Sequence, residues 1–241
     1  RLHWLVLKGD INVFWQRIRD FWADAGVALA WSDPKLGIME TEWIDNEDSE
    51  FARDKFRVRL EPGKKPDTMW LFLTHRGMKR EFIDGEMVNV WGETYSDPEL
   101  EVELTGRLLR FLGMDRPKVA EVQGEMAREL VTATLNVEGE DAHILVEDRV
   151  DRTWLLVGVA LDREGYEIVE SDRDKALYRI QRPEFARLPG SLFGDGERNQ
   201  YVVKVEPEDG NSRVVILNTQ GRQETSNLAK EILTRLYRHL Q

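Results

Sequence analysis

The feature that most constrains this chain is a weak internal repeat. The order of apolar and turn residues in Leu5–Thr41 returns in Ile144–Ile180. Four positions are identical, each pair 139 residues apart: Trp15 and Trp154, Gly26 and Gly165, Ser32 and Ser171, Asp33 and Asp172. The matched positions are an aromatic residue on a helix face, a glycine that ends a helix, and the two residues of a turn. All of these are structural landmarks. We therefore expect two folding units of similar plan.

Composition limits the class of protein. A chain of 241 residues can form two ordinary domains, and 41% hydrophobic with 33% charged residues is typical of a soluble globular protein. The net charge of −11 argues against a nucleic-acid binder and against docking on anionic lipid by charge alone. There is no cysteine, which excludes disulfides and thiolate metal sites but leaves the compartment open.

The first unit is predicted to begin with a strand at Leu2–Leu7 and a helix that ends at Gly26. Phe56–Leu60 alternates strictly between apolar and basic residues, which predicts a strand with one solvent-exposed face. A further strand at Thr68–His75 is expected to end in a turn at Arg76-Gly77.

The strongest helix signal lies between Asp97 and Gly113. Asp97 is a good N-cap, Pro98 suits the first helical position, and Gly113 ends the pattern. The helix has one apolar stripe, formed by Leu100, Leu104, Leu108, Phe111 and Leu112. A stripe of this width has to be buried, so the helix should lie across a sheet.

The second unit repeats this order and closes with a helix from Thr225 or Ser226 to Leu240. The predicted organisation is a first domain over residues 1–113, a connection over 114–142 that could be part helical, and a second domain over 143–241. Each unit then reads β-α-β-β-β-β-α. This order predicts the α+β class, with a curved antiparallel sheet packed on a long C-terminal helix in each domain.

Candidate chemical groups are sparse. No nucleotide-binding, metalloprotease or hydrolase motif is present, and the four histidines are scattered: His3, His75, His143 and His239. His75 and Arg76 could hold an anion together, but a strand-end histidine beside a tight turn is the favoured interpretation. Glu40 and Glu42 could form a carboxylate pair, and here a solvated strand face is favoured. No catalytic, metal or cofactor residue is assigned, so we expect no cofactor and no enzyme activity.

Tryptophan is concentrated early in the chain, with seven of eight residues before Gly92: Trp4, Trp15, Trp22, Trp31, Trp43, Trp70 and Trp91. Core packing should account for most of them, with one or two at a partner surface. The chain also begins at Arg1 inside a strand-like pattern, so we expect it to be a fragment with any targeting or anchor segment upstream.

Several segments together resemble one known family. They are Trp4–Val6, the helix around Trp15, GIMETEW at Gly37–Trp43, RDKFRVRLEPG at Arg53–Gly63, THRGM at Thr74–Met78 and SDPELE at Ser96–Glu101. The chain is similar to the BamC family, lipoprotein subunits of the β-barrel assembly machinery in the Gram-negative outer membrane. The similarity is specific in the first unit, and in the second it rests on the tandem plan and the final helix.

The resemblance implies two tandem helix-grip domains and a non-catalytic accessory subunit that acts through protein contacts in outer-membrane protein assembly. It implies other subunits of the machinery as partners, especially BamD, through an N-terminal segment that this chain does not contain. The lipidated cysteine of the family is also outside the chain. The implied location is the outer membrane, on the periplasmic side or the cell surface, with membrane contact only through an upstream lipid anchor and no nucleic acid. The alternative is a periplasmic helix-grip protein that binds a small apolar ligand.

Overall fold

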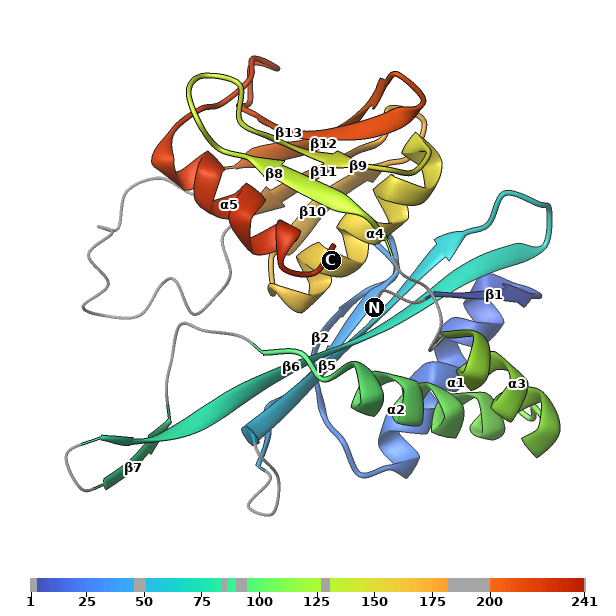
Figure 1. Cartoon of the computed structure of the whole chain (residues 1–241). Helices are drawn as coiled ribbons and strands as arrows, with labels where there is room; N and C mark the ends of the chain where they lie inside the picture. The colour runs from blue at the N-terminus through green and yellow to red at the C-terminus, as the bar shows by residue number, and fades with distance from the viewer. Residues whose placement is uncertain are drawn as a thin grey trace. The chain divides into compact units, whose positions relative to one another are not determined.

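The computed structural model describes residues 4–45, 51–83, 86–89, 95–126, 131–181 and 200–240. The chain divides into two compact units. The N-terminal unit comprises His3–Glu129, and the C-terminal unit comprises Leu130–Gln241 together with Arg1–Leu2. Each contains an antiparallel sheet and helices (Figure 1), so the predicted α+β class is confirmed.

The N-terminal unit is built on a seven-stranded sheet with the strand order β1-β6-β5-β3-β2. Two short strands lie off this path, β4 paired with β5 and β7 paired with β6. The strands are β1 (Leu5–Lys8), β2 (Leu29–Asp33), β3 (Ile38–Thr41), β4 (Ile44–Asp45), β5 (Phe51–Pro62), β6 (Thr68–Ile83) and β7 (Glu86–Asn89). The long β5–β6 hairpin is the centre of the sheet.

Helix α1 (Ile11–Asp24) forms where the apolar periodicity predicts it. The Asp10 side chain caps it by accepting the backbone N–H of Asn12 at 2.7 Å. Gly26, with φ of +70°, follows its last turn, as expected of a glycine that ends a helix. Its buried face consists of Trp15, Ile18, Phe21 and Trp22 at helical spacing, whereas Ala25 at its end is exposed.

Helix α2 (Pro98–Phe111) also begins as predicted, with Asp97 Oδ1 accepting the N–H groups of Glu99 and Leu100. Of the predicted stripe, Leu108 is fully buried, and four other members are half-buried against the same core: Leu100, Leu104, Phe111 and Leu112. Helix α3 (Arg116–Met126) follows, and its Val119 also lies in this core.

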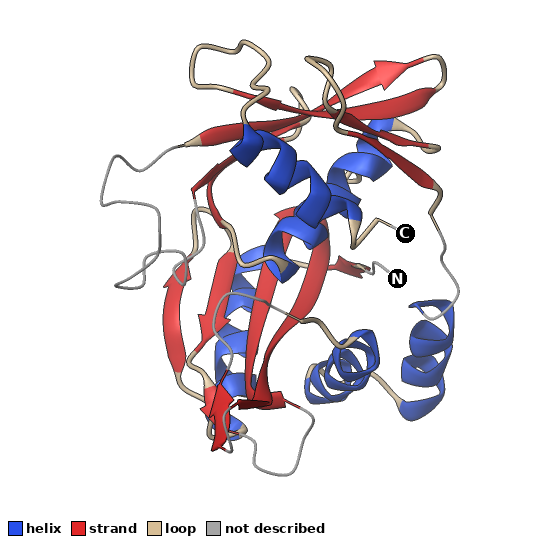
Figure 2. Cartoon of the chain, turned by 60° about the vertical axis from the view of Figure 1, so that its left-hand side comes forward, coloured by secondary structure: helices blue, strands red, loops and turns tan. Residues whose placement is uncertain are grey.

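The C-terminal unit has a six-stranded sheet in the order β10-β11-β12-β13-β9-β8. Its strands are β8 (Ala133–Asn136), β9 (His143–Val146), β10 (Glu167–Asp172), β11 (Leu177–Gln181), β12 (Tyr201–Glu208) and β13 (Asn211–Leu217). Helices α4 (Val150–Arg163) and α5 (Asn227–Tyr237) lie on the same face of this sheet (Figures 1 and 2).

The two sheets share one strand order. The chain order of β9, β10, β11, β12 and β13 corresponds to that of β1, β2, β3, β5 and β6, and each set has the same neighbours in space. The sheets differ in their extra strands: the N-terminal sheet has β4 and β7, and the C-terminal sheet has β8 beside β9. The sequence pattern predicts no strand at the four residues of β8.

Two sequence-based expectations for the central hairpin are wrong. No turn occurs at Arg76-Gly77, because β6 continues to Ile83 and Gly77 pairs with both Asp54 and Tyr95. The basic face of Phe56–Leu60 is not solvent-exposed either, since Arg57 and Arg59 are 4% and 1% exposed. Along the described residues, no helix is long and apolar enough to cross a bilayer.

Candidate functional site

The two faces of β5 carry different chemistry. Phe56, Val58 and Leu60 point into the apolar core with α1 and α2. Because successive side chains of a strand alternate between faces, Lys55, Arg57 and Arg59 project from the opposite face. That face brings together charged groups from three strands, and we call the set Glu40, Lys55, Arg57 and Arg76 the Glu40 cluster.

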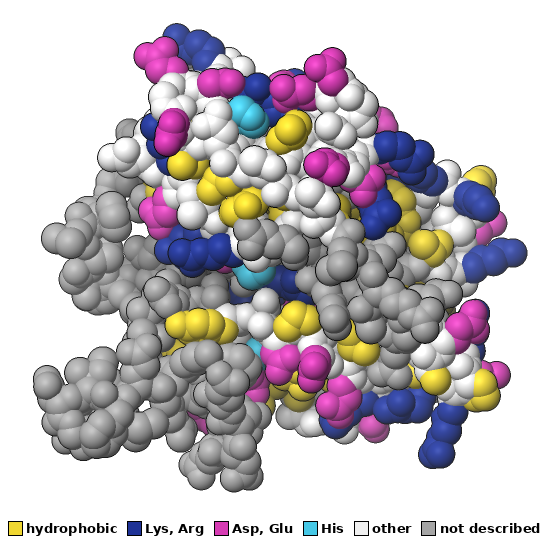
Figure 3. All heavy atoms as spheres, in the orientation of Figure 1, with side chains coloured by type: hydrophobic (Ala, Val, Ile, Leu, Met, Phe, Trp, Pro, Cys, Tyr) yellow, Lys and Arg dark blue, Asp and Glu magenta, His cyan; other side chains and the backbone are white. Residues whose placement is uncertain are grey.

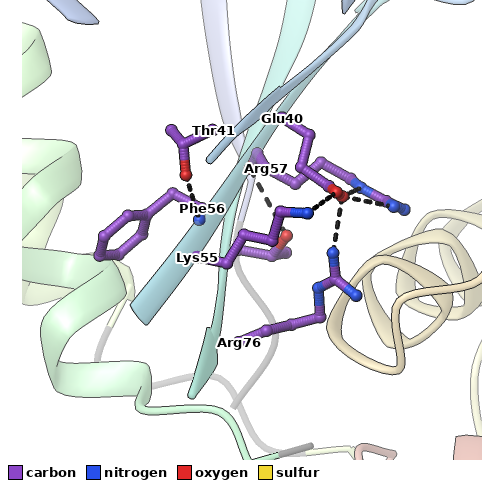
Figure 4. Close-up of polar contacts among 7 residues, drawn as sticks. Glu40, Thr41, Lys55, Phe56, Arg57 and Arg76 are labelled. Carbon is purple, nitrogen blue, oxygen red and sulfur yellow. Dashed lines mark hydrogen bonds and ion pairs between the residues drawn. The ribbon is translucent and has the colours of Figure 1, made fainter. Parts of the chain in front are cut away.

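One carboxylate holds the three cations of the Glu40 cluster (Figure 4). Glu40 Oε1 lies 2.7 Å from Lys55 Nζ, and Oε2 lies 2.7 Å from Nη2 of Arg57 and of Arg76. Arg57 also donates from Nε to Oε2 at 2.9 Å. The strand register explains the meeting, because Glu40 pairs with Arg57 and Lys55 pairs with Arg76.

The cluster keeps Glu40 ionised. Burial by itself would raise the pKa of this carboxyl, but attraction to Arg57, Arg76 and Lys55 outweighs burial and holds the pKa well below its ordinary value of 4.5. Trp43 adds an aromatic surface, with its ring centroid 5.4 Å from Lys55 Nζ and 5.9 Å from Arg76 Cζ. The buried Glu40 cluster and the half-buried Trp43 together therefore form a charged and aromatic group, and its one carboxylate is paired with all three cations.

A second polar network lies on the helix side of the same sheet, around His75. Its ring Nδ1 accepts the backbone N–H of Asp97 at 3.0 Å, and its Nε2 lies 2.9 Å from Asp54 Oδ1. Since Nδ1 is an acceptor, the proton must be on Nε2, which donates to Asp54. The backbone N–H of His75 donates to Oε1 of the buried Glu101 at 2.9 Å. His75 thereby ties β6 to the start of α2.

The structure does not bring the predicted site residues together as pairs. His75 and Arg76 are adjacent on one strand, so their side chains lie on opposite faces and form no shared anion site. Of the two glutamates, Glu42 is exposed as expected, whereas the solvated-face prediction is wrong for Glu40, which is 3% exposed.

The other two described histidines do not form a centre with His75. His143 lies in β9 with Nδ1 donating to the Asp141 carbonyl, and His239 Nε2 lies 2.8 Å from Glu164 Oε1 at the end of α4. His3 lies outside the described residues. In the described ranges, no three histidine or acidic side chains are grouped so that they could hold a metal ion.

The matched tryptophan of the C-terminal unit has a packing role. Trp154 of α4 stacks on Tyr178 of β11, with ring centroids 4.8 Å apart and planes 3° from parallel. The Tyr178 hydroxyl donates to the Trp154 carbonyl at 3.2 Å. This pair fixes the helix on the sheet, as expected of a core landmark.

Sequence reasoning missed the Glu40 cluster and the Asp54–His75–Asp97 network. Part of the signal for the cluster was present, because Glu40 and Arg57 lie in predicted strands and carry opposite charges. Lys55 and Arg76 fall just outside the predicted strands at Phe56–Leu60 and Thr68–His75. Arg57 and Arg76 lie 17 and 36 positions after Glu40 in the chain, so only the sheet register could reveal their contacts with its carboxylate. On the described surface in Figure 3, Lys and Arg are interspersed with Asp and Glu and form no single basic patch.

Comparison with known proteins decides the family. The outer membrane protein assembly factor BamC of Accumulibacter regalis is 32% identical over 273 residues, an alignment that covers 98% of this chain and 71% of that protein. The chain belongs to the BamC family. The BamC of Thiobacillus denitrificans is 27% identical over 98% of the chain and 73% of its own length, and that of Shewanella sediminis is 23% identical over 86% and 59%.

Other comparisons add little to the BamC assignment. No protein-family model matches the chain. The di-domain ARO/CYC StfQ of the steffimycin pathway aligns with 100% of this chain and 96% of its own at 11% identity, but its TM-score of 0.20 carries no argument. The resemblance drawn from GIMETEW, RDKFRVRLEPG and THRGM is thus confirmed, and these segments contain every member of the Glu40 cluster.

Proposed function

We propose that this BamC-family chain is a non-catalytic accessory subunit of the outer-membrane β-barrel assembly machinery and acts through protein–protein contacts. The observation that carries the proposal is the 32% identity to an outer membrane protein assembly factor over 98% of the chain. An alignment of that extent includes both units and not one module alone.

The chemistry of the described polar groups supports a non-catalytic role. A general base needs a free lone pair within reach of a substrate. Both ring nitrogens of His75 are engaged by Asp54 and Asp97, and the carboxylate of Glu40 is engaged by three cations. These two buried groups stabilise the sheet, and neither is directed at a substrate as a proton acceptor.

Further features of the family extend the proposal. We expect BamD as a partner, an upstream lipid anchor and a location at the outer membrane. We also interpret the two units as tandem helix-grip domains over 1–113 and 143–241, joined by 114–142; the shared strand order supports this interpretation. Limited proteolysis tests the boundaries, since the first cut should fall between Met114 and Ala142 and leave two folded fragments.

Deletion of the gene in its own bacterium tests the function. If the protein assists assembly, the amount of folded β-barrel protein in the outer membrane should fall, and the intact gene should restore it. The measurement is the heat-modifiable, folded fraction of barrel proteins on gels. Unchanged barrel levels, under conditions that also sensitise the rest of the machinery, would contradict the proposal.

A further inference from the structure

The outer edge of β1 is unpaired among the described residues. β1 ends the N-terminal sheet, and its pairing partner is β6, in a regular register from Leu5 opposite Leu71 to Lys8 opposite Thr68. An edge strand presents a row of backbone N–H and C=O groups to which another strand can bond.

The hydrogen-bond pattern shows which groups point outward. Gly9 N–H donates to the Asp67 carbonyl at 2.8 Å, so Gly9 faces β6. In an antiparallel ladder alternate residues bond to the same neighbour, which places Leu5 and Leu7 on the β6 side. Val6 and Lys8 therefore direct their backbone N–H and C=O away from the sheet, and no hydrogen bond between described residues reaches them.

The C-terminal unit uses the equivalent positions to hold a strand. At the repeat spacing of 139 residues, Val6 corresponds to Leu145 and Lys8 to Glu147. There β8 pairs antiparallel with β9, with Thr134 opposite Leu145, and the Glu147 N–H donates to the Thr132 carbonyl at 2.9 Å. Val6 is 62% exposed, whereas Leu145, beside β8, is half-buried.

The strands that end the two main strand orders at their other edges carry features that discourage pairing. β2 is irregular, with a register shift between Leu29 and Trp31. β10 has a similar shift between Ile168 and Glu170 and adds acidic side chains, and β8 is contacted by α5. β1 has a regular register and an exposed apolar Val6, so of these four strands it is the best suited to accept another strand.

The positive charge around Lys8 indicates which kind of residue a partner should carry at this end of the edge. Lys8 is exposed, and Lys64 and Lys65 lie exposed in the β5–β6 loop whose Asp67 bonds to Gly9. These three lysines outnumber the two nearby aspartates, Asp10 and Asp67. Directly opposed residues of paired strands interact, so an acidic residue opposite Lys8 is complementary and a basic one is repelled.

We propose that the outer edge of β1 is a strand-addition site for an extended segment of a partner protein. The segment runs antiparallel to β1, as β8 runs to β9, with a β-branched or aromatic residue opposite Val6 and an acidic residue opposite Lys8. Backbone hydrogen bonds to Val6 and Lys8 hold the segment, and the two side-chain positions select it. The site is defined by the sheet and does not depend on the assembly role.

A peptide with the sequence of the β8 region tests the site directly. The probe spans residues 131–137 with Thr132→Asp, which puts the acid opposite Lys8, and the control peptide carries Thr132→Lys. The probe, added at millimolar concentration to the intact chain, should slow amide exchange at Val6 and Lys8 and shift their NMR signals. The control peptide should bind several-fold more weakly.

Two variants sharpen the test. Val6→Pro removes the outward N–H and leaves the hydrogen bonds between β1 and β6 in place, because the Val6 backbone makes none of them. It should therefore lower probe affinity roughly fivefold to tenfold. Val13→Ser, which alters an exposed apolar residue on α1, should not change affinity. Lys8→Glu should reverse the preference between the two peptides, and this result stays informative if Val6→Pro does not fold.

Several results would overturn the proposal. One is the absence of protection at Val6 and Lys8 with the probe, and another is equal binding by Val6→Pro. Protection of these amides without peptide, in a concentration-dependent dimer or in a longer form of the protein, would assign the edge to a second copy or to the protein's own upstream chain.

Discussion

Glu40 of β3 and Arg76 of β6 are joined by a 2.7 Å ion pair that crosses the intervening strand β5. Arg57 and Lys55 of β5 bind the same carboxylate, so one side chain ties three strands together. Removal of this buried carboxylate should be strongly destabilising, because it leaves three positive charges close together.

Glu40→Gln should lower the free energy of unfolding of the N-terminal unit by about 3 kcal/mol at neutral pH. Urea denaturation followed by tryptophan fluorescence measures this unit, since seven of the eight tryptophans precede Gly92. Glu42→Gln is the matched control, because Glu42 is exposed and the same change there should stay within about 0.5 kcal/mol. Equal effects of the two variants would show that the cluster contributes nothing.

The contribution of Glu40 to the free energy of unfolding should depend on pH. Its pKa is depressed in the folded protein, so the stabilisation is complete above the ordinary value of 4.5 and is lost as the pH falls from there toward the folded pKa. The stability difference between wild type and Glu40→Gln should therefore shrink below about pH 4.5. Denaturation curves at a series of acidic pH values check this, and a difference that grows on acidification would contradict it.

Gly37 and Gly26 have nearly the same backbone conformation, with φ of +68° and +70°, so alanine substitutions at the two positions can be compared directly. A Cβ on Gly37 would meet the Leu60 carbonyl oxygen at 2.1 Å, whereas one on Gly26 would meet nothing within 4 Å. Gly26→Ala should cost about 1 kcal/mol from the left-handed backbone alone, and Gly37→Ala about 3 kcal/mol or more. Thermal unfolding of both variants gives the comparison, and similar losses would count against the close β3–β5 approach.

His75→Ala should loosen the start of α2. The change leaves the buried Asp54 carboxylate and the Asp97 N–H without the imidazole, which should cost about 3 kcal/mol. Hydrogen exchange should accelerate in the first turn of α2 before the rest of the unit. His143→Ala, at a less buried strand position, is the control and should have a small effect; unaltered exchange in His75→Ala would refute the tie between β6 and α2.

Trp154→Ala should destabilise the C-terminal unit by about 4 kcal/mol, because it removes a buried ring and the stacking on Tyr178. Circular dichroism during urea denaturation reports the loss. Trp31→Ala removes the same volume from a half-buried position on the edge strand β2 and should cost clearly less. If the two variants were equally stable, Trp154 would not be the core landmark that the repeat indicates.

Local signals explain what could be predicted from the sequence. The start of α2 depends on Asp97 and Pro98, which lie beside the helix, and the buried face of α1 follows from the spacing of Trp15, Ile18 and Trp22. Such features are encoded within one or two helical turns. They also carried the recognition of the repeat.

Non-local contacts explain what was missed. Alternation at Phe56–Leu60 is the usual pattern of a half-exposed strand, and it cannot show that Glu40 lies opposite Arg57. Gly77 is a turn signal in isolation, but here it pairs within a long strand. The four residues of β8 become a strand only because β9 lies beside them, and no local pattern records that neighbour.

The proposed function depends on contact between this chain and the barrel-assembly machinery. Its most direct test is affinity purification of the full-length tagged protein from its own membranes, with quantitative mass spectrometry against an unrelated outer-membrane lipoprotein carrying the same tag. BamD and the other subunits of the machinery should be enriched well above that control. Recovery of none of these subunits above the control level would contradict the proposed function.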